Sequence, residues 1–189
     1  MRELSMHILD IAQNSIAADA TLIEINVIAD TASDILQIAI KDNGAGMSPE
    51  IICAVQDPFL TTCATHRVGQ GIPMFAQAAR ACDGDIKVQS AQKIGTFVEA
   101  TFRFSHIDRA PLGDIASTLI ALISVNPDID FRYRQVVDSH EFILDTREVK
   151  SKLDVVPINE NAVIKWMANT FKIKPPEMCR LGLVCNLQF

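Results

Sequence analysis

Apolar residues recur along the first eighteen positions of the chain at the spacing of an amphipathic helix. The residues at this spacing are Leu4, Ile8, Ile11 and then Ser15 or Ile16. Two β-branched, alternating runs follow at residues 22–28 and 35–40, and the turn-like stretch ADTASD separates them. The pattern predicts a helix over residues 3–18 that packs on a core, followed by an antiparallel hairpin.

Helical and strand-like patterns alternate through the rest of the chain. Further helices are predicted at residues 48–55, 72–82, 114–124, from about 146, and 161–171, and further strands at 86–90, 96–104, 131–137 and 141–145. The loop 56–69 is long enough to be a lid or a binding loop.

A junction is predicted around residues 107–113, where HIDRAPLGD combines Pro and Gly. The chain is therefore expected to have a first part at residues 1–107. A smaller C-terminal α+β extension of unknown role is expected at residues 108–189.

Composition indicates a globular protein, since 189 residues with 49% hydrophobic content can bury a core. A net charge of -6 argues against nucleic acid as a partner, because proteins that bind its backbone carry basic surfaces. The five cysteines are odd in number and show no CxxC pair, so neither a disulfide framework nor a zinc site is indicated. No apolar stretch approaches the ~20 residues of a membrane span. We expect a cytoplasmic protein with no membrane segment.

Three polar residues of the first predicted helix, His7, Asp10 and Asn14, are spaced by three and four. At about 100° per residue they share a narrow arc of the helix. A carboxylate can orient or deprotonate an attacking group, and an Asn oxygen can join the coordination of Mg²⁺. The triple alone is more typical of a solvated helix face, and it gains weight only from the blocks that follow.

Two glycine-containing blocks follow, DNGAGM at residues 42–47 and VGQGIP at residues 68–73. Asp42 ends a predicted strand and could accept a hydrogen bond from an adenine amino group, while Gly44 and Gly46 would keep side chains off the base. VGQGIP leads into a helix whose first N–H groups favour phosphate. A tight turn and a flexible loop are the alternatives for each block alone. Their order along the chain favours an ATP site without a P-loop.

In this order the blocks resemble the GHKL ATPases, the superfamily of DNA gyrase B, histidine kinases, a heat-shock chaperone class and DNA mismatch-repair ATPases. The match covers about residues 3–105, and DPFLTT at residues 57–62 resembles the lid entry of histidine kinases. The resemblance implies a Bergerat-type α/β fold, a two-layer α+β sandwich that binds ATP with Mg²⁺. It makes residues 1–107 a histidine-kinase-like ATPase domain.

The resemblance also implies roles for individual residues. Asp10 would be the catalytic carboxylate, and Asn14 the Mg²⁺ ligand beside the nucleotide. Nucleotide-binding residues would also include Asp42, Gly44, Gly46, Met47, Thr61, Thr62, Arg67, Gly69, Gly71 and Thr96. Among them, Thr96 would support Asp42 through a water molecule.

Several departures from the family pattern bear on activity. Many members have Glu in place of Asp10, and the shorter side chain puts hydrolysis in question more than binding. Arg67 stands where a lid Gly is common and would contact phosphate, since a guanidinium forks well onto phosphate oxygens. No dimerisation or phosphoacceptor segment precedes the first helix, so the chain is not expected to be a self-contained histidine kinase.

The remaining candidates have structural interpretations. His7 shares a rigid helix with Asp10, so a role as phosphoacceptor is disfavoured. Trp166 and Phe171 lie at helical spacing and are predicted to be core residues.

Three functions remain open. The first is a stand-alone kinase-type ATPase domain, a phosphotransferase that phosphorylates a partner protein or signals to one. The second is an ATP-dependent conformational switch that acts through the C-terminal extension, with a homodimer as one form. The third is a nucleotide sensor without catalysis.

Overall fold

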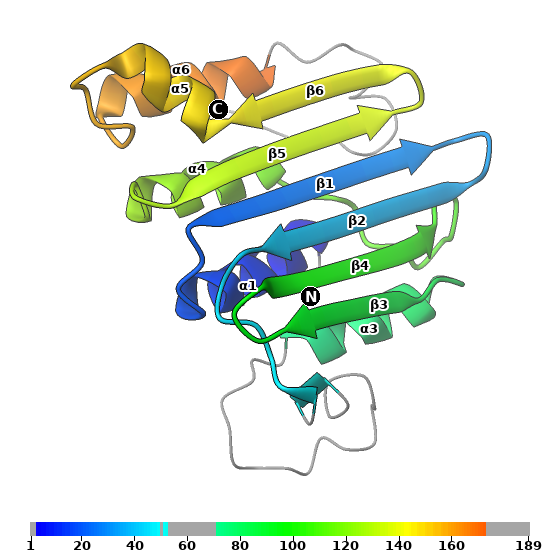
Figure 1. The fold of residues 1–189 in the computed structure, drawn as a ribbon. Helices are drawn as coiled ribbons and strands as arrows, with labels where there is room; N and C mark the ends of the chain where they lie inside the picture. Colours follow the sequence, from blue (N-terminus) through cyan, green and yellow to red (C-terminus); the bar gives the residue numbers. More distant parts are fainter. Residues whose placement is uncertain (1–2, 50, 53–70, 173–189) are drawn as a thin grey trace.

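A six-stranded sheet organises the fold of this computed structural model, which describes residues 3–49, 51–52 and 71–172. The helices are α1 (Leu4–Ala17), α3 (Gly71–Arg80), α4 (Ile115–Val125), α5 (Thr146–Leu153) and α6 (Asn161–Lys172). The strands are β1 (Leu22–Asp30), β2 (Ile35–Asp42), β3 (Ile86–Ala91), β4 (Gly95–Arg103), β5 (Asp130–Val137) and β6 (His140–Asp145). Their order in the sheet is β3-β4-β2-β1-β5-β6 (Figure 1).

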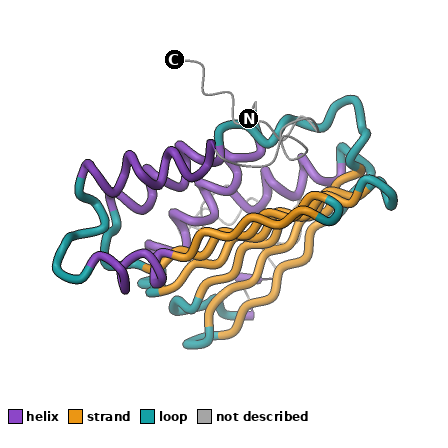
Figure 2. The backbone as a smooth tube through the Cα atoms, turned by 90° about the horizontal axis from the view of Figure 1, so that it is seen from above, coloured by secondary structure: helices purple, strands orange, loops and turns teal. Residues whose placement is uncertain are grey.

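The molecule has two layers, with α1, α3 and α4 on one face of the sheet (Figure 2). This arrangement confirms the predicted two-layer α+β sandwich. Helix α1 presents the predicted apolar stripe to the core, where Leu4, Ile8 and Ile11 have exposed fractions of 3% or less. The hairpin of β1 and β2 is antiparallel, as its alternation predicts. Among the described residues, no helix has the length and apolar character needed to cross a membrane.

The C-terminal strands extend the same sheet. Strand β5 pairs with β1 in parallel, and β6 pairs with β5 as the predicted second hairpin. The chain between the two parts is bonded to the start of α1, where the Leu4 N–H donates to the Pro111 carbonyl (2.9 Å) and the Ser5 N–H to the Leu112 carbonyl (2.8 Å). The residues on either side of the boundary predicted at residue 107 therefore contribute to one sheet, and the segment after it is hydrogen-bonded to α1.

An aromatic cluster closes the core under the C-terminal strands. The ring of buried Tyr133 lies 6.0 Å from that of Phe171, and the Phe171 ring lies 5.3 Å from that of Phe142. The prediction that Phe171 is a core residue is confirmed. The same prediction for Trp166 is wrong, because 54% of this residue is exposed, at a groove that it lines together with residues of α5.

Replacing Phe131 with Ala tests whether the two parts of the sheet unfold together. Phe131 is 1% exposed on β5, and the cavity left by its removal should lower the free energy of unfolding by about 3–5 kcal/mol. Because β5 is bonded to β1, the amides of β2 and β4 should lose protection from hydrogen exchange together with those of β5. Ile143→Ala, at a 44% exposed position of β6, is the control and should change stability little. Unchanged protection of β4 in Phe131→Ala would mean that the C-terminal part unfolds separately.

Candidate functional site

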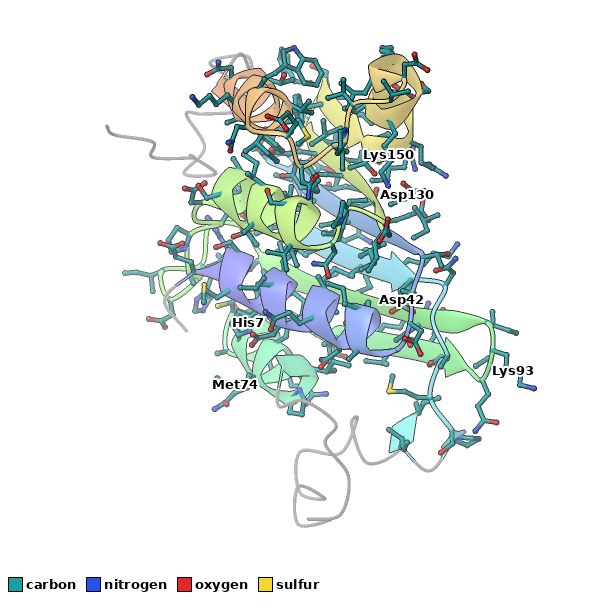
Figure 3. All side chains as sticks on the ribbon, turned by 90° about the vertical axis from the view of Figure 1, so that its left-hand side faces the viewer. His7, Asp42, Met74, Lys93, Asp130 and Lys150 are labelled. Atoms are coloured by element: carbon teal, nitrogen blue, oxygen red, sulfur yellow. The ribbon has the colours of Figure 1, made fainter. Side chains whose placement is uncertain are left out.

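A cavity of about 220 Å³ lies between the C-terminal half of α1 and the loop that follows β2. Of the residues predicted to bind nucleotide, those that line it are Asn14, Asp42, Gly46, Met47 and Thr96. The apolar lining residues are Ile11, Ala17, Ala18, Met47, Ile51, Ile72 and Val98. Figure 3 looks onto this end of the sheet, where Asp42 points toward α1. Residues far apart in the sequence thus meet around one largely apolar space.

Asp42 is the buried charged group of this cavity, with an exposed fraction of 7%. One of its oxygens, Oδ1, accepts from the N–H groups of Gly44 (2.9 Å) and Thr96 (3.1 Å). The other, Oδ2, accepts from the Ser15 hydroxyl (2.7 Å). A carboxylate has about four acceptor positions, so these three donors fix its orientation and leave one position on Oδ2. That position suits a ligand with an N–H donor.

The glycines of the loop after β2 allow it to approach the protein backbone closely. Gly46 has φ +69°, and a Cβ there would lie 2.0 Å from the Ala91 carbonyl oxygen. A Cβ on Gly44 would lie 2.6 Å from the Ala18 carbonyl oxygen. The sequence predicts these glycines to clear space for a base. The structure adds a second requirement, which is contact of the loop with α1 and with the β3–β4 hairpin.

Ser90, on β3, connects this loop to the start of β4. Its hydroxyl accepts from the Met47 N–H (2.8 Å) and donates to the Gly95 carbonyl (2.9 Å). Since the Ser90 proton is used, the Thr96 hydroxyl must be the donor in its 2.9 Å contact with the Ser90 oxygen. The backbone N–H of Thr96 also donates directly to Asp42. The support through a water molecule that the resemblance implies stays a prediction.

Ser15 and Ser90 are the residues of this site that the sequence analysis did not identify. Ser15 lies four residues after Ile11 on the core-facing side of α1, where it is 3% exposed. A small polar residue within an apolar stripe is the only signal that could have marked it. Ser90 sits in a short edge strand and has no comparable signal.

The predicted phosphate end of the site is formed where α3 meets α1. Gly71, the first residue of α3, is buried against the polar arc of α1. A Cβ on Gly71 would lie 3.0 Å from the Asp10 Cβ and 3.7 Å from Asn14 Nδ2. The structure therefore brings Asp10, Asn14 and Gly71 together at the start of α3.

Four predicted site residues, Thr61, Thr62, Arg67 and Gly69, lie outside the described residues. The helix predicted at residues 48–55 is described only in part. Pro49, Ile51 and Ile52 are helical, and the Ile52 N–H donates to the Ser48 carbonyl (3.1 Å).

The residues present fit ATP with Mg²⁺. The apolar walls suit a planar base, and the open acceptor position of Asp42 suits an exocyclic amino group. In the described part of the chain, no three His, Cys, Asp or Glu residues cluster in a way that could hold a metal. A Mg²⁺ bound by Asn14 would also be coordinated by phosphate oxygens and water, as Mg²⁺ commonly is.

One protein-family model and several solved structures are similar to this chain. The family model for histidine kinase-, DNA gyrase B-, and HSP90-like ATPases matches residues 2–106. A solved structure, the Aquifex aeolicus MutL ATPase domain complexed with ADP, is 13% identical with a TM-score of 0.48, covering 92% of this chain and 70% of that one. The N-terminal domain of a DNA repair protein is 15% identical with a TM-score of 0.50, covering 94% of this chain. This chain spans 59% of that structure, and the likeness concerns the fold.

Replacing Ser15 with Ala should loosen the buried Asp42 carboxylate. The loss of a hydrogen bond to a charged group should lower the free energy of unfolding by about 1.5–3 kcal/mol, and ATP affinity should fall with it. The control is Ser124→Ala in α4, which removes only a hydroxyl bonded to the Ile120 carbonyl of the same helix. Chemical denaturation and calorimetric titration with ATP measure both effects. If Ser15→Ala and Ser124→Ala behave alike in both, the hydrogen bond does not position Asp42.

Proposed function

This chain belongs to the family of histidine kinase-, DNA gyrase B- and HSP90-like ATPases, and from this premise we propose that it binds Mg-ATP beside Asp42 and transfers phosphate. The proposed activity is that of a kinase-type ATPase domain, which phosphorylates a partner protein or signals to one. The observation that carries the proposal is the arrangement of α1. Asp10 and Asn14 lie on this helix beside Gly71, and the same helix holds the Asp42 carboxylate through Ser15.

At the base end of the site, Asp42 would accept a hydrogen bond from the adenine amino group. Its three protein donors hold the carboxylate before ligand arrives, so little ordering is left to occur on binding. Met47, Ile72 and Val98 would contact the faces of the base. This geometry supports adenine over guanine, because guanine places an acceptor oxygen where adenine has its amino group.

At the phosphate end, Asn14 would contribute an oxygen to Mg²⁺, and the first N–H groups of α3 would face the phosphates. ATP supplies the transferable phosphoryl group, and the metal neutralises its charge. Asp10 would accept the proton of an incoming hydroxyl, from a partner side chain or from water. Its short side chain favours an acceptor delivered by a partner over unassisted hydrolysis.

A second function, an ATP-dependent conformational switch, is supported by the attachment of the C-terminal extension to α1. The first turn of α1 is bonded to residues 111 and 112, and β5 is bonded to β1. A shift of α1 on nucleotide binding would therefore reach the extension, and through it a partner or a second copy of the chain. A nucleotide sensor is the limiting case, in which Asp10 takes no proton.

Asp10→Asn should separate catalysis from binding. The amide keeps the shape of the carboxylate but cannot take up the proton, so turnover should fall by at least ~100-fold while ATP affinity changes little. The measurement follows γ-labelled Mg-ATP into free phosphate and protein-bound label, with and without a candidate partner. Asp19→Asn, at an exposed position after α1, is the matched control and should retain wild-type turnover. Wild-type turnover in Asp10→Asn would show that Asp10 does not accept a proton in the reaction.

Asp42→Asn should weaken ATP binding itself and not turnover alone. The amide carries an N–H₂ group in place of one oxygen, so it would face the donors that now bond Asp42. ATP affinity should fall by about 1.5–3 kcal/mol, which is a factor of roughly 10 to 150. Calorimetric titration measures this loss, and Asp114→Asn at the N-cap of α4 is the control. An unchanged ATP affinity in Asp42→Asn would mean that the adenine base does not bind at Asp42.

A further inference from the structure

His7 is a buried imidazole in the contact between α1 and α3 (Figure 3). It is 3% exposed, and its ring stacks on that of Phe75 with centroids 5.2 Å apart. Phe75 in turn packs against Phe102 of β4, at 5.7 Å. Within the described part of the chain, His7 Nδ1 is buried without a hydrogen-bond partner. A neutral ring tolerates this environment, whereas a charged ring needs acceptors for two N–H groups.

The contact that encloses His7 also forms the phosphate end of the proposed nucleotide site. His7 precedes Asp10 by one turn of α1, and Phe75 follows Gly71 by one turn of α3. Gly71 in turn lies against Asp10 and Asn14. Any movement of α3 that gives the His7 ring access to water would therefore also move Gly71 relative to the polar arc of α1.

A second cavity, of about 220 Å³, opens beside His7 on the side away from Asp42. Met74 and Gln77 of α3 line it together with Cys82 and Asp108. The cavity gives water a path to the edge of the ring once α3 shifts. It therefore provides a route by which a proton from solvent can reach His7.

The charged groups around His7 do not compensate a positive ring. Burial is the main cause that lowers the pKa of His7, the positive amino terminus lowers it further, and Asp10 acts in the opposite direction. From α3 the facing polar group is the uncharged Gln77, while Arg80 is paired with Asp85. Beyond α3, Asp108 is exposed to solvent, and burial raises the pKa of the Cys82 thiol, which keeps it neutral.

We propose that His7 makes the contact between α1 and α3 sensitive to acid, so that its protonation separates the two helices and weakens nucleotide binding. The part concerning nucleotide rests on the proposed function. In the closed form the pKa of His7 lies below its ordinary value of 6.5, and in the open form it returns toward that value. The open form therefore binds the proton, and opening is favoured as the pH falls below 6.5.

Hydrogen exchange of the α3 amides tests the opening without any ligand. For one proton taken up on opening, the protection factors of residues 71–80 should fall by up to about tenfold between pH 7.5 and pH 5.5. In His7→Phe, which keeps a ring to stack on Phe75, they should be the same at both pH values. His140→Gln on β6 is the matched control and should behave like the wild type. Equal pH dependence in the wild type and His7→Phe would overturn the proposal.

Titration of Mg-ATP at the same two pH values tests the consequence for binding. The wild type should lose more affinity at pH 5.5 than His7→Phe, and the variant corrects for protonation of the nucleotide itself. Absence of ATP binding at pH 7.5 would contradict the proposed function, while the exchange experiment still decides whether His7 controls the helix contact.

If His7→Phe fails to fold, a pH titration of the wild type replaces it, in which the NMR chemical shifts of the imidazole C–H protons of His7 are followed. A midpoint below 6.5, with α3 exchange rising over the same range, supports the proposal. A midpoint at or above 6.5 overturns it.

Discussion

The buried carboxylate of Asp42 is the constraint around which this site is built. A buried charge is costly unless it is hydrogen-bonded, and here the donors come from three different parts of the chain. Ser15 belongs to α1, Gly44 to the loop after β2, and Thr96 to β4. The same bonds that satisfy the charge therefore tie the helix layer to the sheet. Asp42 is the one charged group among the described residues that line the cavity, and it cannot turn without leaving a donor unpaired.

Helix α1 connects the two ends of the candidate site with the C-terminal extension. The first turn of α1 is hydrogen-bonded to residues 111 and 112. At its other end, the carbonyl of the C-cap residue Ala18 accepts from the Ala45 N–H in the loop after β2 (2.8 Å). Helix α3 packs against the polar arc of α1. One rigid helix of 14 residues thus touches the base end of the site, the phosphate end and the C-terminal extension. Such a helix can transmit a change from one of these places to another. This requires that the helix has two alternative positions and that the ligand binds the protein with different affinity in each.

Local patterns in the sequence predict much of this structure. The period of α1, the alternation of β1 and β2, and the position of Asp42 at a strand end all follow from residues close together in the chain. The parallel pairing of β5 with β1 has no such signal, because strands that meet through a long connection share no local pattern. Trp166 shows a related limit, since helical spacing gives the angle between two side chains but not which of them meets a neighbour. The roles of Ser15 and Ser90 likewise depend on partners distant in sequence.

The kinase and switch functions differ in what the free energy of nucleotide binding is used for. In the proposed kinase function Asp10 would be held at the reacting oxygen, so a rigid contact between α1 and α3 would favour transfer. A switch needs two positions of that contact with comparable free energies. The buried Nδ1 atom of His7 has no hydrogen-bond partner in the described part of the chain, which lowers the stability of the closed contact and brings the two positions closer in free energy. Under the proposed role of His7, the residue that weakens the contact would also make it responsive to pH, so that firm nucleotide binding at neutral pH and a second state recognised by a partner would be compatible in one domain.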